Sequence, residues 1–182
     1  MKSLKEKINS AFDGLRKEFG YKNRMQAPRL VKVVISTGIG SLKDKSKIET
    51  IADRLGKITG QKAALRGAKK SIATFKVRQN DPVGYQVTLR GPRMYDFLTR
   101  FFEIALPRTR DFRGLARTSI DEMGNYTVGV KENVIFPETA DEELRDVFGL
   151  SVSIVTTARS KEEALRFLEH IGLPLRKDKA AA

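Results

Sequence analysis

The sequence lacks cysteine altogether and has a single histidine among its 182 residues. Without cysteine, the chain can form neither a disulfide framework nor a cysteine-based metal site. The common nucleophile–base pairs of covalent catalysis are missing as well. The one histidine, His170, falls near the end of an expected helix, where a cation interacts favourably with the helix dipole. We therefore expect His170 to be structural, and we expect no catalytic residue, no metal and no cofactor.

Long apolar runs are absent too. No stretch approaches the roughly 20 apolar residues of a membrane-spanning helix, and the N-terminal MKSLKEKINSAF has no apolar region of the signal-peptide kind. Together with the missing cysteine, this predicts a cytoplasmic protein. The length predicts one domain over residues 1–182, with roughly 70% of the unfolded surface buried. The polar tail, about 176–182, is expected to fray.

The whole chain has a formal net charge of +13, and acidic residues are scarce in one part of it. Residues 54–95 hold ten cations and a single acid, Asp81, whereas residues 96–182 have a net charge of −2. This distribution predicts a polyanionic partner. A solvated basic face without a partner would show the same pattern, but self-repulsion at such a density is unfavourable unless it has a use.

Helix boundaries are indicated by capping boxes and glycines. Three helices are expected to begin at Ser3-x-x-Glu6, Ser46-x-x-Glu49 and Ser160-x-x-Glu163, and to end at Gly20, Gly60 and Gly172. A fourth is expected from about Pro92 to Ala105, before Pro107. Its phenylalanines recur on one side, so they are expected in the core rather than around a ligand.

Short β-branched or alternating segments predict strands at 31–36, 85–90, 126–130 and 151–157. Within the second, Tyr85, Val87 and Leu89 are expected to face helices, and Gln86, Thr88 and Arg90 the opposite side. We therefore predict an α+β fold, an open, mostly antiparallel sheet with helices packed on one face and a polar open face.

A long basic hairpin arm is predicted at about 69–84. Its cations alternate with Ile72, Phe75 and Val77, and the stretch 81–84 (DPVG) predicts a turn with proline at the favoured second position. Cations contact phosphates, and neighbouring hydroxyl or amide groups fix the register. Because paired exposed aromatics that would stack single-stranded bases are lacking, these residues favour structured RNA.

Two further motifs each allow more than one interpretation. Gly38-Ile39-Gly40 follows a strand as in a dinucleotide-binding fingerprint, but Lys43 stands where the third glycine is required. We expect instead a tight turn whose backbone N–H groups approach phosphate. The acidic stretch 138–143 (ETADEE) is either a solvated helix start or a landing site for a basic protein.

Several of these segments together resemble the bacterial large-subunit ribosomal protein five family, which binds 5S rRNA. The likeness covers nearly the whole chain, and the order and spacing of its pieces are very specific. The matching pieces are GQK (60–62), KKSIATFKVRQ (69–79), VTLRG (87–91), ALPRTRDFRG (105–114), GNY (124–126), VIFPE (134–138) and TTAR (156–159).

The resemblance implies a structural constituent of the large subunit that attaches 5S rRNA in the central protuberance. It implies further contacts with 23S rRNA, P-site tRNA, neighbouring large-subunit proteins and a basic small-subunit protein. The 5S rRNA side would comprise Ser36, Gly38, Gly40, Gln61, Lys62, Arg66, Gln86, Thr88 and Arg90. The P-site tRNA or 23S rRNA contact would comprise Lys69, Lys70, Lys76, Arg78, Gln79 and Asn80. The inter-subunit bridge would comprise Glu138, Asp141, Glu142 and Glu143.

Three positions depart from the family pattern. Ser36 stands where the family usually has asparagine, Asp121-Glu122-Met123 replaces a loop with glycine and arginine, and Thr109 replaces isoleucine. An RNA contact at each of the first two positions is therefore in question. The alternative function is an RNA-modifying or RNA-processing enzyme with a basic platform. The lack of a convergent group of histidine, cysteine or carboxylate side chains disfavours it.

Overall fold

The computed structural model describes residues 4–42, 44–139 and 147–176. The chain folds as two compact units. Unit 1 comprises Met1–Val33, Arg90–Val128 and Ser153–Ala182, and unit 2 comprises Val34–Leu89 and Gly129–Val152. Both units are assembled from separate stretches of sequence, and strands run from one unit into the other. The single domain over 1–182 stays a prediction.

Within these described residues, five strands form one open antiparallel sheet in the order β2-β3-β1-β5-β4. This confirms the predicted α+β class. The strands are β1 (Leu30–Gly38), β2 (Ala64–Gly67), β3 (Pro82–Leu89), β4 (Tyr126–Val130) and β5 (Leu150–Thr156). The sequence predicted four of them and missed β2. All four residues of β2 are exposed, so it has no buried side to produce an alternating pattern.

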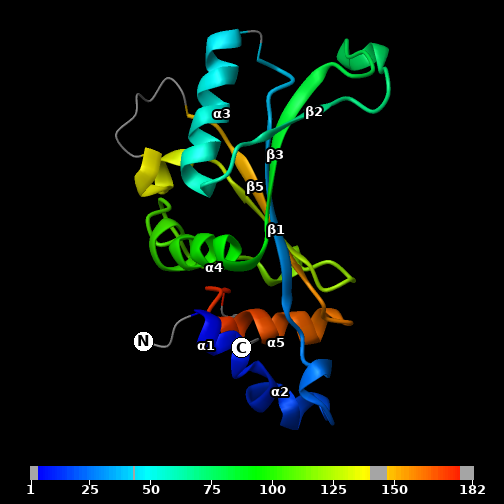
Figure 1. Cartoon of the computed structure of the whole chain (residues 1–182), viewed down its shortest axis with the longest axis vertical. Coiled ribbons are helices and arrows are strands. Elements are labelled where there is room, and N and C mark those ends of the chain that lie inside the picture. Colours follow the sequence, from blue (N-terminus) through cyan, green and yellow to red (C-terminus); the bar gives the residue numbers. More distant parts are fainter. Residues whose placement is uncertain (1–3, 43, 140–146, 177–182) are drawn as a thin grey trace, which may run out of the picture. The chain divides into compact units, whose positions relative to one another are not determined.

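In unit 2, helix α3 (Lys45–Thr59) packs along one face of the strands and contacts β3 (Figure 1). It buries Ile51, Leu55 and Ile58 there. Val87 and Leu89 of β3 are buried at 1% and 0% exposure, whereas Gln86 and Thr88 between them are half-exposed. The predicted division of β3 into a helix-facing side and a polar side is confirmed for these residues.

Only the C-terminal end of α3 lies where the sequence predicts it. Gly60 ends the helix in the left-handed region, with φ +67°, as expected. The N-cap is Asp44 rather than Ser46, so that prediction was wrong. Ser46 lies within the first turn, and its carbonyl accepts a hydrogen bond from the Thr50 hydroxyl at 3.0 Å. The helix therefore begins one residue before the predicted cap.

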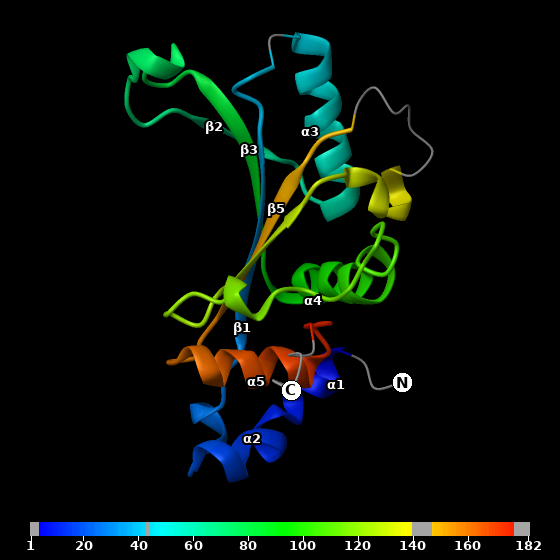
Figure 2. The ribbon, with the colours of Figure 1, turned by 180° about the vertical axis from the view of Figure 1, so that it is seen from behind.

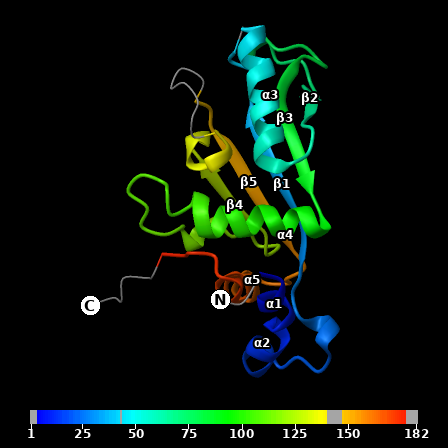
Figure 3. The same ribbon diagram turned by 60° about the vertical axis from the view of Figure 1, so that its left-hand side comes forward.

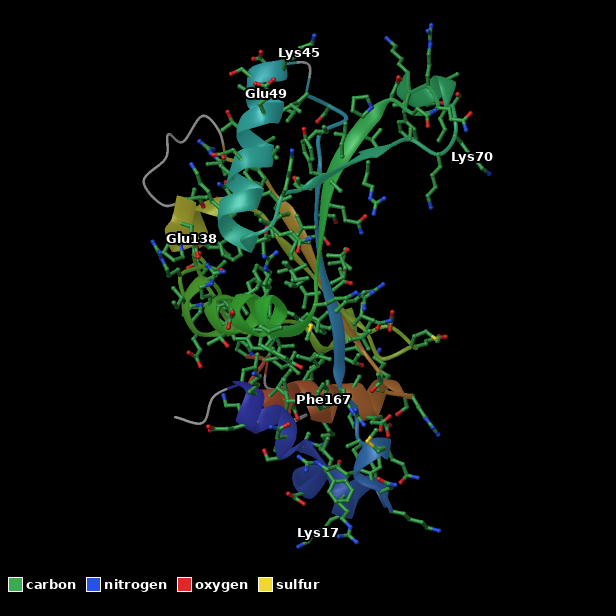
Figure 4. The ribbon with its side chains drawn as sticks, viewed as in Figure 1. Lys17, Lys45, Glu49, Lys70, Glu138 and Phe167 are labelled. Atoms are coloured by element: carbon green, nitrogen blue, oxygen red, sulfur yellow. The ribbon has the colours of Figure 1, made fainter. Side chains whose placement is uncertain are left out.

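Unit 1 contains α1 (Leu4–Asn9), α2 (Ala11–Phe19), α4 (Gly91–Arg100) and α5 (Lys161–Ile171). A π-helical turn at Phe101–Ala105 extends α4, which confirms the predicted helix over about 92–105. Helices α1 and α2 pack on α5 (Figure 3). In Figure 4, Phe167 lies within α5, where it is fully buried. The single helix predicted before Gly20 is instead two, because the first ends at Asn9.

The break between α1 and α2 involves His170. The Ser10 hydroxyl donates to the Lys7 carbonyl at 2.9 Å, and the His170 Nε2 lies 3.1 Å from the Ser10 Oγ and 3.0 Å from the Lys7 carbonyl. A Cβ at Gly14 would approach the His170 ring to 2.8 Å. The histidine thus joins α5 to the N-terminal helices, as its expected structural role requires.

At its other end, α5 begins with the predicted cap. The Glu163 backbone N–H donates to the Ser160 hydroxyl at 3.2 Å. The buried Glu163 carboxylate accepts hydrogen bonds from the Arg159 backbone N–H at 2.7 Å and from the Tyr21 hydroxyl. The start of α5 is therefore tied to the chain that follows α2.

Candidate RNA interface

The polar face of the sheet in unit 2 carries the first group of predicted site residues. Ser36 of β1 and Gln86 and Thr88 of β3 are half-exposed. The exposed Arg66 of β2 donates from its Nε to the Gln86 Oε1 at 2.7 Å. In the register of the strands, Arg66 pairs with Gly84, so its guanidinium lies diagonally across from Gln86. A cation is thereby held beside hydroxyl and amide groups.

Gln61 completes the edge of this sheet. Strand β2 begins at Ala64, which pairs with Gln86, so the Thr88 carbonyl lies beyond the end of β2. The Gln61 Nε2 donates to that carbonyl at 3.4 Å. Gln61 therefore supports β3 as well as lying beside the exposed Lys62. Arg90 is exposed directly after β3, where the chain enters unit 1.

The turn after β1 is tight, as the sequence predicted. The Ile39 N–H donates to the Val83 carbonyl at 2.9 Å, and the Leu42 N–H donates to the Ile39 carbonyl at 2.9 Å. Gly38 and Gly40 are exposed, and a Cβ at Gly38 would meet no atom within 4 Å. The backbone at these glycines is therefore open to close approach by a partner.

The segment 68–81, called the basic loop below, stands beyond the ends of β2 and β3 (Figure 1). The long hairpin arm predicted at about 69–84 is not confirmed. Ala68 exchanges backbone hydrogen bonds with Asn80 and Asp81, both of 2.9 Å, and the chain then folds back through an Ile72–Val77 bridge around a 3-10 turn at Ala73–Phe75. Figure 2 shows this folded tip from behind. Two extended limbs are therefore replaced by a compact loop.

Asp81, the one acid of this region, fixes the turn. Its carboxylate accepts a hydrogen bond from the Arg78 N–H at 2.7 Å, and its own N–H donates to the Arg78 carbonyl at 3.1 Å. The turn predicted at 81–84 was wrong, because Pro82 already belongs to β3. The actual turn lies at 78–81, and Asn80 occupies its left-handed position with φ +70°.

The predicted contact residues of the basic loop are all exposed. They are Lys69, Lys70, Lys76, Arg78, Gln79 and Asn80. In Figure 4, the Lys70 side chain points away from the loop. Sequence reasoning placed apolar residues here but gave them no surface role, whereas Phe75 is 73% exposed and Ile72 is 45% exposed. The loop therefore presents cations and apolar side chains together.

The acidic stretch is described only at its first two residues, Glu138 and Thr139. Glu138 is half-buried in a 3-10 turn at Pro137–Thr139 that contacts α3 (Figure 4). The other three predicted bridge residues, Asp141, Glu142 and Glu143, lie outside the described residues. The sequence did not reveal that the buried Asn133 exchanges hydrogen bonds of 3.1 Å with Phe148, through its side-chain oxygen and its own N–H. Asn133 thereby joins the chain before the acidic stretch to the chain after it.

The loop that departs from the family pattern has a local role. The Asn125 backbone N–H and side-chain amide donate to the Asp121 carboxylate at 2.6 Å and 3.0 Å. Burial raises the pKa of Asp121, but hydrogen bonds from Asn125 and from the Met123 backbone outweigh it and leave the pKa below its ordinary value. Asp121 thus stays charged and closes the turn before β4.

Two other kinds of site are absent from the residues that the structure describes. No helix in residues 4–42, 44–139 and 147–176 has the length and apolar character needed to cross a membrane. The same residues contain no group of three or more histidine, cysteine, aspartate or glutamate side chains arranged to hold a metal ion.

Comparison with known proteins defines the class first. Residues 23–78 match the family described as ribosomal protein L5, and residues 82–175 match the family described as the C-terminus of the same ribosomal protein. The class is therefore that of ribosomal proteins, a family of structural proteins rather than enzymes.

Curated relatives are similar to this chain over most of its length. The large ribosomal subunit protein uL5 of Trichlorobacter lovleyi is 50% identical over 92% of this chain and 94% of its own length. That of Mesoplasma florum is 49% identical over 90% and 91%, respectively. The chain belongs to the ribosomal protein L5 family and is a protein of the large ribosomal subunit. This membership confirms the predicted location in the cytoplasmic ribosome.

Proposed function

We propose that the chain binds 5S rRNA through the open face of unit 2 and so attaches this RNA in the central protuberance. The observation that carries the proposal is the arrangement of Ser36, Thr88 and Arg66 on one polar sheet face, with the Arg66 guanidinium held by Gln86. The segment 54–95, which supplies most of this face, holds ten cations and one acid. The face therefore joins hydrogen-bonding groups to positive charge.

The chemistry of this face suits an RNA helix. A-form RNA displays 2′-hydroxyl groups and base edges in a wide, shallow minor groove, with phosphates on both sides. Ser36 and Thr88 hydroxyls both donate and accept hydrogen bonds, as does the 2′-hydroxyl group. Gln86 accepts from Arg66 through its oxygen, which leaves its NH2 group to donate. Arg66 and Lys62 supply charge for the flanking phosphates.

Two further contacts belong to the same proposal. The exposed cations of the basic loop support contact with a second polyanion, either P-site tRNA or 23S rRNA. The acidic stretch 138–143 supports a bridge to a basic protein of the small subunit. Because Glu138 is half-buried, such a bridge would depend chiefly on the acids that follow it in the sequence.

The test compares a double variant of the polar face with the removal of a cation elsewhere in unit 2. Thr88→Ala with Arg66→Ala should weaken binding to 5S rRNA, because one charge-assisted contact contributes roughly 1.5–3 kcal/mol. Lys45→Ala is the matched control, since Lys45 is an exposed cation at the start of α3 that points away from the unit (Figure 4). Equal gel-shift affinities for the double variant, the control and the wild type would refute the assignment.

A further inference from the structure

An open groove of about 760 Å³ lies in unit 2 between α3 and the β2–β3 pair, on the side of the sheet opposite the polar face. Its walls come from the last turns of α3, the segment after it, and the β2–β3 pair. Leu65 and Tyr85 are paired across those strands, so their side chains share the side of the sheet on which the groove opens. The volume falls within the roughly 300–1,000 Å³ typical of sites for small ligands.

Gly56 of α3 leaves one wall of the groove without a side chain. Gly56 lines it, and a Cβ built at Gly56 would have only the Gln61 carbonyl near it, at 4.0 Å. A larger residue on this turn would cover the Leu65–Tyr85 pair. Leu65 is left 55% exposed and Tyr85 half-exposed. Glycine in a helix interior is destabilising by about 0.5–1 kcal/mol relative to alanine, so this opening is unfavourable for the isolated helix.

The rim of the groove is polar and carries two lysines. Lys57 forms an ion pair of 2.9 Å with Asp53, and Lys62 is exposed. Gln61 lines the groove and also donates to the Thr88 carbonyl, so the groove extends to the edge of the sheet, where β2 separates it from the polar face proposed to bind RNA. An occupant should therefore combine a flat apolar part with negative charge, and an RNA bound on the polar face would reach the groove around the β2 edge of the sheet.

We infer that this groove receives one unpaired nucleotide of the bound RNA, an inference that rests on the proposed function. The base would stack on the Tyr85 ring, and the Gln61 amide would meet its polar edge. The phosphate would lie near Lys62. Unpaired bases in RNA loops are commonly splayed out onto aromatic side chains in this way. A single ring in a bounded groove limits the contact to one base, which differs from the paired aromatics that bind runs of single strand.

The first test fills or empties the groove. Gly56→Met places a side chain in it, whereas Gly56→Ala leaves it open and serves as the control. Tyr85→Ala removes the stacking ring, whereas Tyr85→Phe retains it. Gly56→Met and Tyr85→Ala should each weaken binding to 5S rRNA by about 5- to 150-fold, the range for loss of one base–aromatic stack. The two controls should bind within about twofold of wild type, and thermal unfolding checks that each variant is folded.

A second test identifies the base. A series of 5S rRNA molecules, each with one abasic nucleotide at an unpaired position, is titrated against wild type and Tyr85→Ala. At one position, removal of the base should weaken RNA binding by the wild-type protein. The same abasic RNA should bind Tyr85→Ala as tightly as the unmodified RNA does. An abasic scan without such a position would overturn the inference, whatever the affinity of Gly56→Met.

The outcomes separate this inference from the proposed function. Wild-type RNA affinity in the groove variants, together with weak binding by the Thr88→Ala/Arg66→Ala double variant, would overturn the inference and leave the proposed function standing. Wild-type affinity in both sets would refute both. Groove variants that bind 5S rRNA normally but enter large subunits poorly would show that a protein segment occupies the groove, which also overturns the inference.

Discussion

Gly84 of β3 is the glycine of unit 2 at which an added Cβ would come closest to a neighbouring atom. A Cβ there would approach the Thr37 carbonyl oxygen of β1 to 2.7 Å. Ordinary contact begins at 3.4 Å, so Gly84→Ala must separate the two strands locally by several tenths of an ångström. The neighbouring hydrogen bond from the Ile39 N–H to the Val83 carbonyl, 2.9 Å long, would lengthen with them. The obstacle is backbone, so no rotamer change relieves it.

The expected loss of stability follows from this geometry. Overpacking that shifts backbone typically destabilises by about 1–3 kcal/mol. For a chain of this length, about 2 kcal/mol corresponds to a fall in Tm of about 4–8 °C. Gly38→Ala is the matched control, because its Cβ would meet nothing within 4 Å and its φ is an ordinary one. Calorimetry of both variants decides the matter, and a Tm for Gly84→Ala equal to that of Gly38→Ala would refute the reasoning.

Three further predictions concern other parts of the chain. Tyr21→Phe should destabilise by about 1–3 kcal/mol, because buried Glu163 loses a hydrogen bond. Burial, followed by that hydrogen bond, raises the pKa of the Tyr21 hydroxyl above 10.0. The stabilisation that Tyr21 contributes is therefore complete below pH 10 and declines at higher pH. In urea unfolding from about pH 9 to 11, the free energies of unfolding of the wild type and Tyr21→Phe should converge. Binding to 5S rRNA should weaken with salt at a log–log slope of about −4 if about five phosphates are neutralised, and a flat dependence would contradict this. Replacing residues 69–79 with Asn-Gly should leave 5S rRNA binding unchanged and speed release of P-site tRNA, and the reverse result would show that the two surfaces were exchanged.

Local conformational requirements explain which boundaries the sequence predicts well. Gly20, Gly60 and Gly172 all end helices with positive φ, a conformation that glycine adopts without steric penalty. The strands with one buried side also show the expected alternation. Side-chain caps were less dependable, because a serine near a helix start competes with its neighbours. Asp44 begins α3 in place of Ser46, while Ser160 caps α5 as predicted.

The candidate site likewise has one part that the sequence predicts and another that it does not. Gln86 and Thr88 could be assigned to the open face from the period of a single strand. The groove could not, because it depends on the register that pairs Leu65 with Tyr85 and on the approach of Gly56 from another element. The folded shape of the basic loop was missed for a similar reason. Hydrogen bonds between residues such as Ile72 and Val77 leave no periodic pattern in the sequence.

The structure also explains how so many cations can occupy the basic loop. Its shape is maintained by backbone hydrogen bonds and by the Asp81 carboxylate, which accepts from a backbone N–H. None of Lys69, Lys70, Lys76 and Arg78 has an ion-pair partner among the residues that the structure describes. An internal ion pair would fix the loop equally well, but it would reduce the charge offered to a polyanion. Because Asp81 stabilises the turn through the backbone, the loop keeps its fold while all four cations stay exposed to solvent. A density of positive charge that destabilises the free protein through repulsion is thus retained where a phosphate backbone can neutralise it.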